Sequence, residues 1–459
     1  MAGIGFALRR LAQQDTLNAS LRSQVHAAAV TSGPWLFTVL ALAGVELFGA
    51  GFLEREELRV FSVVIIYNFA FSLVISGPVV LVVTRHLADK IYARDVEGAP
   101  GMLLGALCVL FAMQAVVGVP FYFLAVEMTA GERLLALAGF FLVGGIWLVS
   151  AFLSALKSYG SITAAFGFGM ATAYALATLL APRYGAPGML AGFTAGLAVL
   201  FFGLTARVLA EYPYRATDPF GFLPAILRYW EFVLFGFFYN AAIWVDKWIM
   251  WFAPGRMVIA GSMPSHPTYD GAMFLASLSM APAAALFLIV VETRFFESYL
   301  RFYRSIAGHG TAQEIRRNHW EILRVLTEGF RNVAVLQAAV CCLFIMAAPG
   351  LIGMARGGLE LVPTFRFGVL GALFHALLLF VIAIISYFDL RGVLLAVSIV
   401  FFVLNASLTW MVMELGIGYS GYGYFLAALL TLAFAYAMAA RCILRLPYMT
   451  FIANNRALH

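Results

Sequence analysis

The sequence is poor in charged residues. Only 11% of its 459 residues are Asp, Glu, Lys or Arg, 63% are hydrophobic, and the mean hydropathy is +0.92. Soluble globular proteins carry about 25% charged and about 45–50% apolar residues, so this composition excludes a soluble fold. The net charge of +6 comes from basic residues scattered between apolar runs, which excludes a nucleic-acid-binding patch and is typical of membrane loops.

Motifs for catalysis, metal binding and nucleotide binding are also missing. The four cysteines follow neither metal-ligand nor disulfide spacing, and we expect them to be buried thiols: Cys108, Cys341, Cys342 and Cys442. The sequence contains no nucleophile motif and no glycine-rich phosphate loop. It therefore predicts a protein that is not an enzyme, with no catalytic residues, no metal and no cofactor, and it excludes an ATP-driven pump within this chain.

Twelve apolar runs are each long enough to cross a hydrocarbon core, which takes about 20 residues of helix. Runs of this length are too long for the strands of a β-barrel. We therefore predict an all-α polytopic membrane protein with twelve transmembrane helices in two six-helix bundles. The predicted helices are 27–52, 60–83, 101–126, 134–156, 160–181, 186–206, 232–253, 272–292, 333–355, 367–388, 393–414 and 420–440.

A polar break separates the two predicted bundles. Faint similarity between "SGPVVLVVTRHLADKIY" in the second run and "MAPAAALFLIVVETRFFESY" in the eighth indicates an internal repeat, as in many transporters. The alternative is that prolines and exit arginines recur in any membrane protein. The predicted organisation is a cytoplasmic or interfacial helix at 1–26, the first bundle at 27–206, a linker at 207–222, and the second bundle at 223–459 with a cytoplasmic hairpin at 293–332.

The distribution of basic residues predicts the orientation. Most of them lie at the N-terminus, at the C-terminus and in the even-numbered connections, so the positive-inside rule places both termini in the cytoplasm. Residues 1–26 are too long and polar for a short charged leader, so we expect no cleavable signal peptide. The arginines on the opposite side are few: Arg55, Arg59, Arg133, Arg183, Arg256, Arg356 and Arg366.

Three of the prolines inside predicted spans are hinge candidates: Pro34, Pro78 and Pro282. A proline removes one backbone hydrogen bond and kinks or loosens a helix. In lipid, the freed carbonyl must face protein or a wet cavity. The alternative interpretation is that these prolines are static kinks that only shape the helices.

The hairpin at 293–332 is the longest segment outside the predicted spans. "GHG" at 308–310 divides it, and "TAQE" from Thr311 to Glu314 has the spacing of a capping box. An amphipathic hairpin of this kind either rests on the anionic inner leaflet or docks a cytoplasmic partner. The candidate docking residues are Arg316, Arg317, Trp320 and Arg324.

The stretch "IWVDKWIMW" places Asp246 beside Lys247 inside a span. A charge near the bilayer centre costs about 2.5–3.5 kcal/mol or more. Adjacent helical residues point about 100° apart, so we expect these two not to pair with each other. Each should instead face a cavity or another helix, and the candidate partners for Lys247 are Glu46 and Glu414.

Asn240, Trp244, Lys247 and Trp251 recur at helical spacing. Aromatic rings can stack on the apolar faces of sugars while nearby polar groups bind hydroxyls. We therefore predict that this face lines a substrate path, and the predicted set is Asn240, Trp244, Asp246, Lys247, Trp251 and Glu46. The alternative is that the tryptophans anchor the helix at the membrane interface.

The opening "MAGIGFALRRL", followed by "SGPW" at 32–35, resembles the PelG family. Its members are inner-membrane components of bacterial Pel exopolysaccharide biosynthesis, related to the multidrug/oligosaccharidyl-lipid/polysaccharide exporter superfamily. The resemblance implies export of a nascent N-acetylgalactosamine-rich polymer across the bacterial inner membrane. It also implies action with a cytosolic UDP-sugar glycosyltransferase and with two further membrane subunits, one of them a cyclic di-GMP receptor. It supplies no binding motif for Asp246 or Lys247.

Two other functions stay open at this point. The first is an alternating-access flippase for a lipid-linked oligosaccharide or a small amphiphile, in which Pro34 and Pro78 would be sensitive sites. The second is a membrane scaffold that assembles a synthase without transporting anything. The scaffold predicts that alanine at Asp246 or Lys247 leaves export intact, whereas changes within 293–332 abolish it.

Overall fold

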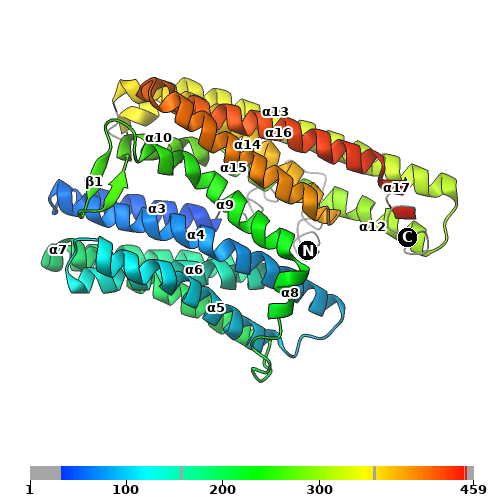
Figure 1. The fold of residues 1–459 in the computed structure, drawn as a ribbon, viewed down its shortest axis with the longest axis horizontal. Coiled ribbons are helices and arrows are strands. Elements are labelled where there is room, and N and C mark those ends of the chain that lie inside the picture. The colour runs from blue at the N-terminus through cyan, green and yellow to red at the C-terminus, as the bar shows by residue number, and fades with distance from the viewer. Residues whose placement is uncertain (1–32, 156–158, 355–357, 449, 452–459) are drawn as a thin grey trace, which may run out of the picture. The chain divides into compact units, whose positions relative to one another are not determined.

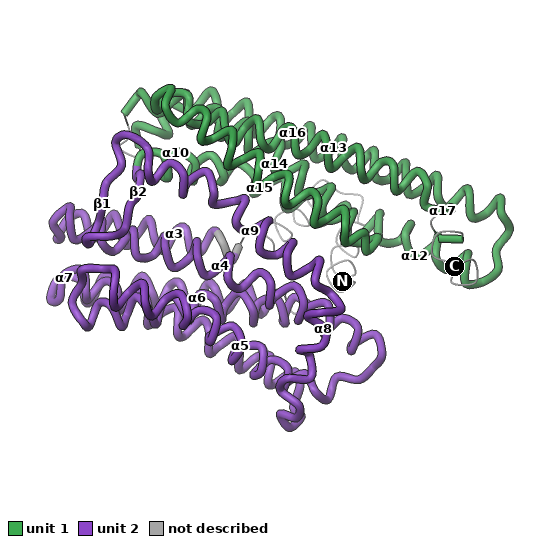
Figure 2. Tube along the Cα trace, in the orientation of Figure 1, with its two compact units in different colours: residues 1–31, 268–459 green, residues 32–267 purple. Residues whose placement is uncertain are grey.

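The computed structural model describes residues 33–155, 159–354, 358–448 and 450–451, and these ranges are helical almost throughout (Figure 1). The predicted interfacial helix at 1–26 lies outside them. The described residues form two compact units: unit 2 covers those up to Pro267, and unit 1 covers those from Thr268 onward (Figure 2). Each unit is described by itself.

Unit 2 contains seven α-helices, one π-helical turn and a small β-hairpin within its described residues. The elements are α3 (Gly33–Gly49), α4 (Arg55–Tyr92), α5 (Ala99–Pro120), η1 (Phe121–Ala125), α6 (Ala130–Ala155), α7 (Tyr159–Glu211), α8 (Leu223–Arg228), α9 (Trp230–Met250), β1 (Met257–Ile259) and β2 (Met263–Ser265). The strands pair antiparallel, with Ile259 opposite Met263.

α7 is two membrane-length helices joined by a sharp turn. Gly185 has φ 63° and ψ −147° there, a conformation that glycine adopts without a side-chain clash. The two arms pack closely at Gly192 and Gly196, which have no side chain to keep them apart. An added Cβ on Gly192 would lie only 2.3 Å from the Ala177 nitrogen, and one on Gly196 only 2.3 Å from the Ala173 Cα. Small residues that let helix backbones approach are typical of membrane helix pairs.

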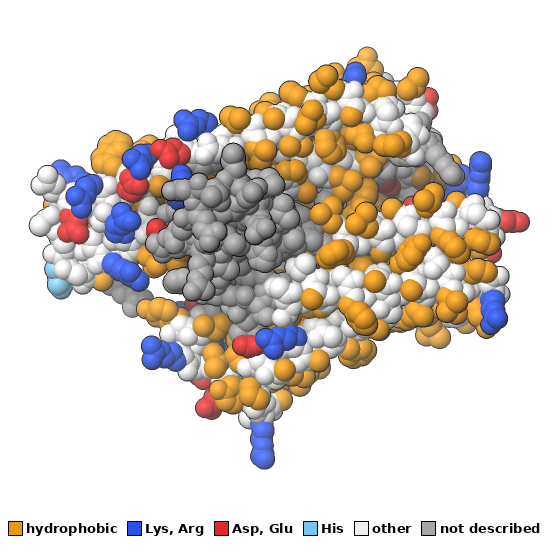
Figure 3. All heavy atoms as spheres, turned by 180° about the vertical axis from the view of Figure 1, so that it is seen from behind, with side chains coloured by type: hydrophobic (Ala, Val, Ile, Leu, Met, Phe, Trp, Pro, Cys, Tyr) orange, Lys and Arg blue, Asp and Glu red, His pale blue; other side chains and the backbone are white. Residues whose placement is uncertain are grey.

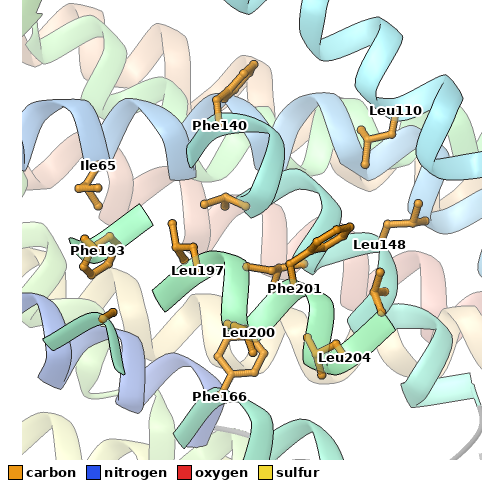
Figure 4. Close-up of a cluster of buried hydrophobic side chains, with 14 of the residues drawn as sticks. Ile65, Leu110, Phe140, Leu148, Phe166, Phe193, Leu197, Leu200, Phe201 and Leu204 are labelled. Carbon is orange, nitrogen blue, oxygen red and sulfur yellow. The ribbon is translucent and has the colours of Figure 1, made fainter. Parts of the chain in front are cut away.

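The apolar core of unit 2 lies between α4, α5, α6 and α7 (Figure 4). Asn68 is a polar residue that is buried in it and hydrogen-bonded. The Asn68 amide donates to the Ala136 carbonyl at 3.0 Å and accepts from the Tyr122 hydroxyl at 2.7 Å, so three elements are tied together. The residues labelled in the close-up are Ile65, Leu110, Phe140, Leu148, Phe166, Phe193, Leu197, Leu200, Phe201 and Leu204.

Unit 1 is built around α14, which packs against α13, α15 and α16. A buried hydrogen bond of 2.8 Å joins His375 Nδ1 on α14 to the Tyr424 hydroxyl on α16. The elements are α10 (Pro267–Leu278), α11 (Ala281–Val290), η2 (Val291–Phe295), α12 (Phe296–Ala307), α13 (Ala312–Met354), η3 (Leu359–Leu361), α14 (Val362–Tyr387), α15 (Arg391–Met413), η4 (Ile417–Tyr419), α16 (Gly421–Leu444) and α17 (Leu446–Tyr448).

In the described part of the chain, ten helical stretches are long and apolar enough to cross a membrane. One of them contains both arms of α7, and α3 is a further apolar helix, so all twelve predicted spans have helical counterparts. The all-α polytopic class is confirmed. On the face shown in Figure 3, hydrophobic side chains cover much of the helix surface, as contact with lipid requires.

The boundary between the compact units lies at 267/268, whereas the predicted bundles meet at 222/223. The difference arises because α9 packs along α4 and therefore belongs to unit 2. The predicted linker at 207–222 overlaps the last turn of α7, which ends at Glu211. Beyond that, Thr217 and Pro219 lie against α5, where a Cβ on Gly101 or Gly105 would clash with their carbonyls.

The structure corrects the prediction for Pro282. The run 272–292 is not one helix, because α10 ends at Leu278 and Pro282 lies in the first turn of α11, where a missing N–H costs nothing. Pro78 does lie inside a continuous helix, α4. Pro34 lies at the start of the described part of α3, and its carbonyl accepts a 3.0 Å hydrogen bond from Thr38.

The four cysteines are free thiols, but only Cys341 is buried. Cys108 and Cys342 are exposed and Cys442 is half-buried, so the expectation that all four are buried is wrong for these three. A thiol is apolar enough to face acyl chains as readily as a protein core, which hydrophobicity alone does not distinguish.

Candidate functional site

The candidate site follows the seam between α4 and α9 inside unit 2. The two backbones meet at a pair of glycines, Gly77 and Gly236. A Cβ on Gly77 would lie 2.6 Å from the Gly236 carbonyl oxygen, and a Cβ on Gly236 would lie 2.6 Å from the Gly77 carbonyl oxygen. Only glycine permits this approach, so the crossing point of the helices is fixed by these two residues.

Asn240 links α9 to α4 close to Pro78. Its Nδ2 donates a 3.2 Å hydrogen bond to the carbonyl of Leu73, in the turn that precedes Pro78. Pro78 has no N–H to donate to the carbonyl of Val74, so Asn240 binds the carbonyl next to the one that the proline leaves without its helical donor. Asn240 therefore has a packing role on the α4 side of α9.

Stacked aromatic rings continue the seam toward the C-terminal end of α9. Trp251 stacks on Tyr67 with centroids 4.7 Å apart and an 8° interplanar angle, and Tyr67 stacks in turn on Phe121 of η1 at 5.7 Å. Trp248 stacks on Phe71 at 5.3 Å and 7°. Trp251 is only 2% exposed and belongs to the core of unit 2.

Asp246 and Lys247 form an ion pair, which corrects the expectation that they do not pair. The lysine Nζ lies 2.9 Å and 3.1 Å from the two carboxylate oxygens, and it donates to the Ile243 carbonyl at 3.2 Å. Helical side chains lean toward the N-terminus of their helix. The long lysine side chain therefore folds back along its own helix, and its ammonium reaches the Asp246 carboxylate although the two Cβ atoms point about 100° apart.

The pair is asymmetric in its exposure to the surface. The Asp246 side chain is fully buried, while that of Lys247 is 17% exposed. The Lys247 ammonium also lies 6.0 Å from the centroid of the half-buried Trp244 ring. Aspartate, lysine and tryptophan thus form one local cluster on α9, which we name the α9 cluster.

Of the two other acids proposed as partners, Glu46 does not pair with Lys247, whereas the pairing with Glu414, which lies in the other unit, stays a prediction. Glu46 accepts a 2.5 Å hydrogen bond from Ser62, which links α3 to α4. Glu414 is exposed and follows the last residue of α15. Both expectations rested on matching depth alone, which does not specify the direction in which a side chain points.

The sequence-predicted path residues therefore fall into separate environments. Trp244, Asp246 and Lys247 are brought together, whereas Asn240 and Trp251 face α4 and Glu46 binds α3 to α4. Sequence reasoning missed Tyr67, Phe71 and Trp248. The spacing of Trp244, Trp248 and Trp251 was a usable signal for a second aromatic face on α9, because residues three and four apart are neighbours.

The predicted hairpin is present as α12 and α13, divided at 308–311. The Thr311 hydroxyl accepts a hydrogen bond from the backbone N–H of Glu314 at 3.2 Å, one half of the predicted capping box. Trp320 is 68% exposed, and the docking candidates Arg316, Arg317 and Arg324 are exposed as well. Among the residues that the structure describes, no group of three or more His, Cys, Asp or Glu could hold a metal ion.

Several solved transporters share the fold. A crystal structure of a MATE mutant is 14% identical, with a TM-score of 0.65 over 93% of this chain and 96% of that chain. An MOP superfamily transporter from Pyrococcus furiosus is 14% identical, with a TM-score of 0.62 over 92% and 96%. An inward-facing multidrug resistance MATE family transporter is 15% identical, with a TM-score of 0.59 over 90% and 98%. Identities this low show the fold alone.

No curated protein matches the sequence. The sequence does match the PelG family, described as "Putative exopolysaccharide Exporter (EPS-E)", over residues 1–451. This match covers nearly the whole chain and confirms the resemblance seen at its N-terminus. Together with the apolar helices and the transporter fold, it makes the chain a multi-pass membrane transport protein. The chain belongs to the PelG family of exopolysaccharide exporters.

Proposed function

We propose that this chain carries a nascent polysaccharide across the bacterial inner membrane and that the α9 cluster contacts the polymer on its way. The observation that carries this proposal is the direction of Lys247. α9 ends at Met250, so the ammonium needs only about one turn to reach the water interface by snorkelling. It folds the other way, deeper along the helix, and pairs with Asp246.

Holding charge at that depth is costly, which supports a functional role. At the centre of a transmembrane helix an ionisable group costs about 2.5–3.5 kcal/mol on insertion scales; Asp246 and Lys247, about one turn from the end of α9, cost less, but ionisable groups within such helices commonly mark substrate paths. The Lys247 ammonium can donate hydrogen bonds to sugar hydroxyl and amide oxygens while the buried Asp246 carboxylate holds it in place, and the Trp244 ring can stack on a sugar face. The chemistry fits a neutral or partly charged polysaccharide.

The family relationship supports the finer parts of the proposal. By family, the polymer would be N-acetylgalactosamine-rich and the chain would act with a cytosolic UDP-sugar glycosyltransferase. Two further inner-membrane subunits, one of them a cyclic di-GMP receptor, would complete the assembly. Both termini would lie in the cytoplasm, as the basic residues predict. Elongation of the polymer would then push it through the exporter.

The test is secretion of polymer by cells that carry Lys247→Ala or Trp244→Ala. We expect secretion about two- to tenfold lower at equal protein level, because one aromatic or cation–π contact contributes about 0.5–1.5 kcal/mol. The matched control is Trp410→Ala on α15, since Trp410 is 62% exposed. Wild-type secretion from both α9 variants would contradict the proposal and favour the non-transporting scaffold.

An alternating-access flippase for a lipid-linked oligosaccharide or a small amphiphile is the second candidate. It is favoured by the fold, because solved MATE family transporters with this fold have been captured facing inward and facing outward. Proteoliposomes that contain only this chain separate the two functions. We expect no amphiphile transport under a proton or sodium gradient, whereas gradient-driven transport without a synthase would favour the flippase.

A further inference from the structure

The first twenty residues of α13 carry a strict charge repeat that the export path does not use. Three glutamates follow one another at intervals of seven residues, and so do three arginines. Each arginine lies three residues after a glutamate. The exposed Trp320 lies between the first two arginines. We name the exposed row the α13 ridge; it consists of Arg317, Trp320, Arg324 and Arg331, and the glutamates beside it are Glu314, Glu321 and Glu328.

The part of the ridge around Arg317 and Trp320 extends beyond the reach of lipid headgroups, whereas Arg331, next to Asn332, lies within the headgroup layer. After Asn332, α13 is uncharged to its end at Met354, and this uncharged segment is long enough to cross the hydrocarbon core. Trp320 lies twelve residues before Asn332, or about 18 Å at a rise of about 1.5 Å per residue. The headgroup layer extends only about 5–8 Å from the hydrocarbon core. Even if α13 is tilted by about 40°, Trp320 still lies about 14 Å above the core.

The charges on the ridge fit an acidic protein surface better than a membrane. Arg324 is paired with Glu321 at 3.1 Å and approaches Glu328 at 3.8 Å. Arg317 and Arg331 make no ion pair with any residue that the structure describes. Anionic lipid would repel the adjacent row of glutamates, whereas a protein can place carboxylates opposite the arginines alone. An exposed tryptophan flanked by arginines is a typical interface anchor.

The opposite face of this part of α13 is held in place by unit 1. Ile322 is fully buried and Val325 nearly so. His319 Nε2 lies 2.8 Å from the Ile443 carbonyl at the end of α16. The ridge is therefore presented on a rigid, packed helix rather than on a loop. Figure 3 shows charged side chains gathered at the end of the molecule that holds α12 and the start of α13.

We propose that the α13 ridge is the docking surface for an acidic face of the cytosolic glycosyltransferase. The identity of that partner rests on the proposed function, and the side of the membrane rests on the predicted orientation. The surface itself is defined by the exposed Trp320 and by Arg317, which makes no ion pair with any residue that the structure describes. Its counterpart should present acidic residues around an apolar pocket that accepts an indole ring.

The test is binding of the purified glycosyltransferase to the full-length chain in phosphatidylcholine nanodiscs. Trp320→Ala and Arg317→Glu should each weaken binding at least about tenfold, because interface anchors contribute more than about 1.4 kcal/mol. Binding should also fall as salt screens the charges. The control is Arg301→Glu, an exposed charge reversal on neighbouring α12, which should stay within about twofold of wild type.

Three outcomes would overturn the docking proposal. The first is no binding of the transferase to the wild-type chain, and the second is wild-type binding by the ridge variants. The third is a spin label at Trp320→Cys that responds to phosphatidylglycerol in the nanodisc and not to the transferase, which would make the ridge a lipid contact. Secretion by Lys247→Ala cells is measured separately, so failure of the ridge leaves the export proposal standing.

Discussion

Replacing Gly77 by alanine should force α4 and α9 apart. The new Cβ would lie 2.6 Å from the Gly236 carbonyl oxygen and 2.2 Å from Asn240 Nδ2, so the helices must separate by roughly 0.8 Å to reach the 3.4 Å of ordinary contact. Overpacking of this kind costs about 1–3 kcal/mol. Loss of the Asn240–Leu73 hydrogen bond adds about 1 kcal/mol, and the better helix propensity of alanine returns about 1 kcal/mol.

The net loss of about 1–3 kcal/mol is measurable as a lower melting temperature of the purified protein in detergent. A shift of about 2–4 °C per kcal/mol is expected for a unit of this size. Gly203→Ala on α7 is the matched control, because no atom lies within 4 Å of the added Cβ, so only the propensity gain remains. A melting temperature for Gly77→Ala equal to or above that of Gly203→Ala would refute the close crossing of α4 and α9.

Two further predictions concern single charges. Asp246→Ala alone should lower the melting temperature more than the double variant Asp246→Ala with Lys247→Ala. The single change leaves an uncompensated ammonium, at a cost of about 3–5 kcal/mol. Equal decreases in melting temperature for the two variants would contradict the pairing. Burial lowers the pKa of His266 below its ordinary 6.5, even though the Pro254 carbonyl accepts a hydrogen bond from the ring. The folded protein therefore favours the neutral ring, so the contribution of His266 to the free energy of unfolding is fully present above pH 6.5 and is lost as the pH falls below it. His266→Gln should flatten that loss in melts between about pH 7.5 and about pH 5.

Hydropathy was sufficient to predict the membrane class and the twelve helices, because each span must satisfy its backbone internally and bury about 20 apolar residues. It could not assign α9 to a unit. That assignment depends on the packing of α9 along α4, which includes the close approach of Gly77 and Gly236, and single glycines carry no hydropathy signal. It also could not show that Pro282 begins a helix, since a proline at the first turn and one in mid-helix look alike in an apolar run.

The candidate site was only partly predictable. Sequence spacing brought Trp244 and Lys247 onto one face, and the structure places them together. Spacing wrongly predicted that Asp246 and Lys247 do not pair, because it assumes that each side chain points straight out from the helix axis. A lysine has enough rotatable bonds to fold back over its own helix. Trp251 was assigned to the path, but its ring is stacked on Tyr67, a partner far away in sequence.

The most direct test of the export path is contact between Trp244 and moving polymer. A photoreactive phenylalanine analogue placed at position 244 should, in cells that secrete polymer, crosslink to material that binds an N-acetylgalactosamine lectin. The same analogue at the exposed position of Trp410 should not. An adduct at 244 that disappears when polymer synthesis is blocked is the predicted result. Normal secretion with no polymer adduct at 244 would contradict the account.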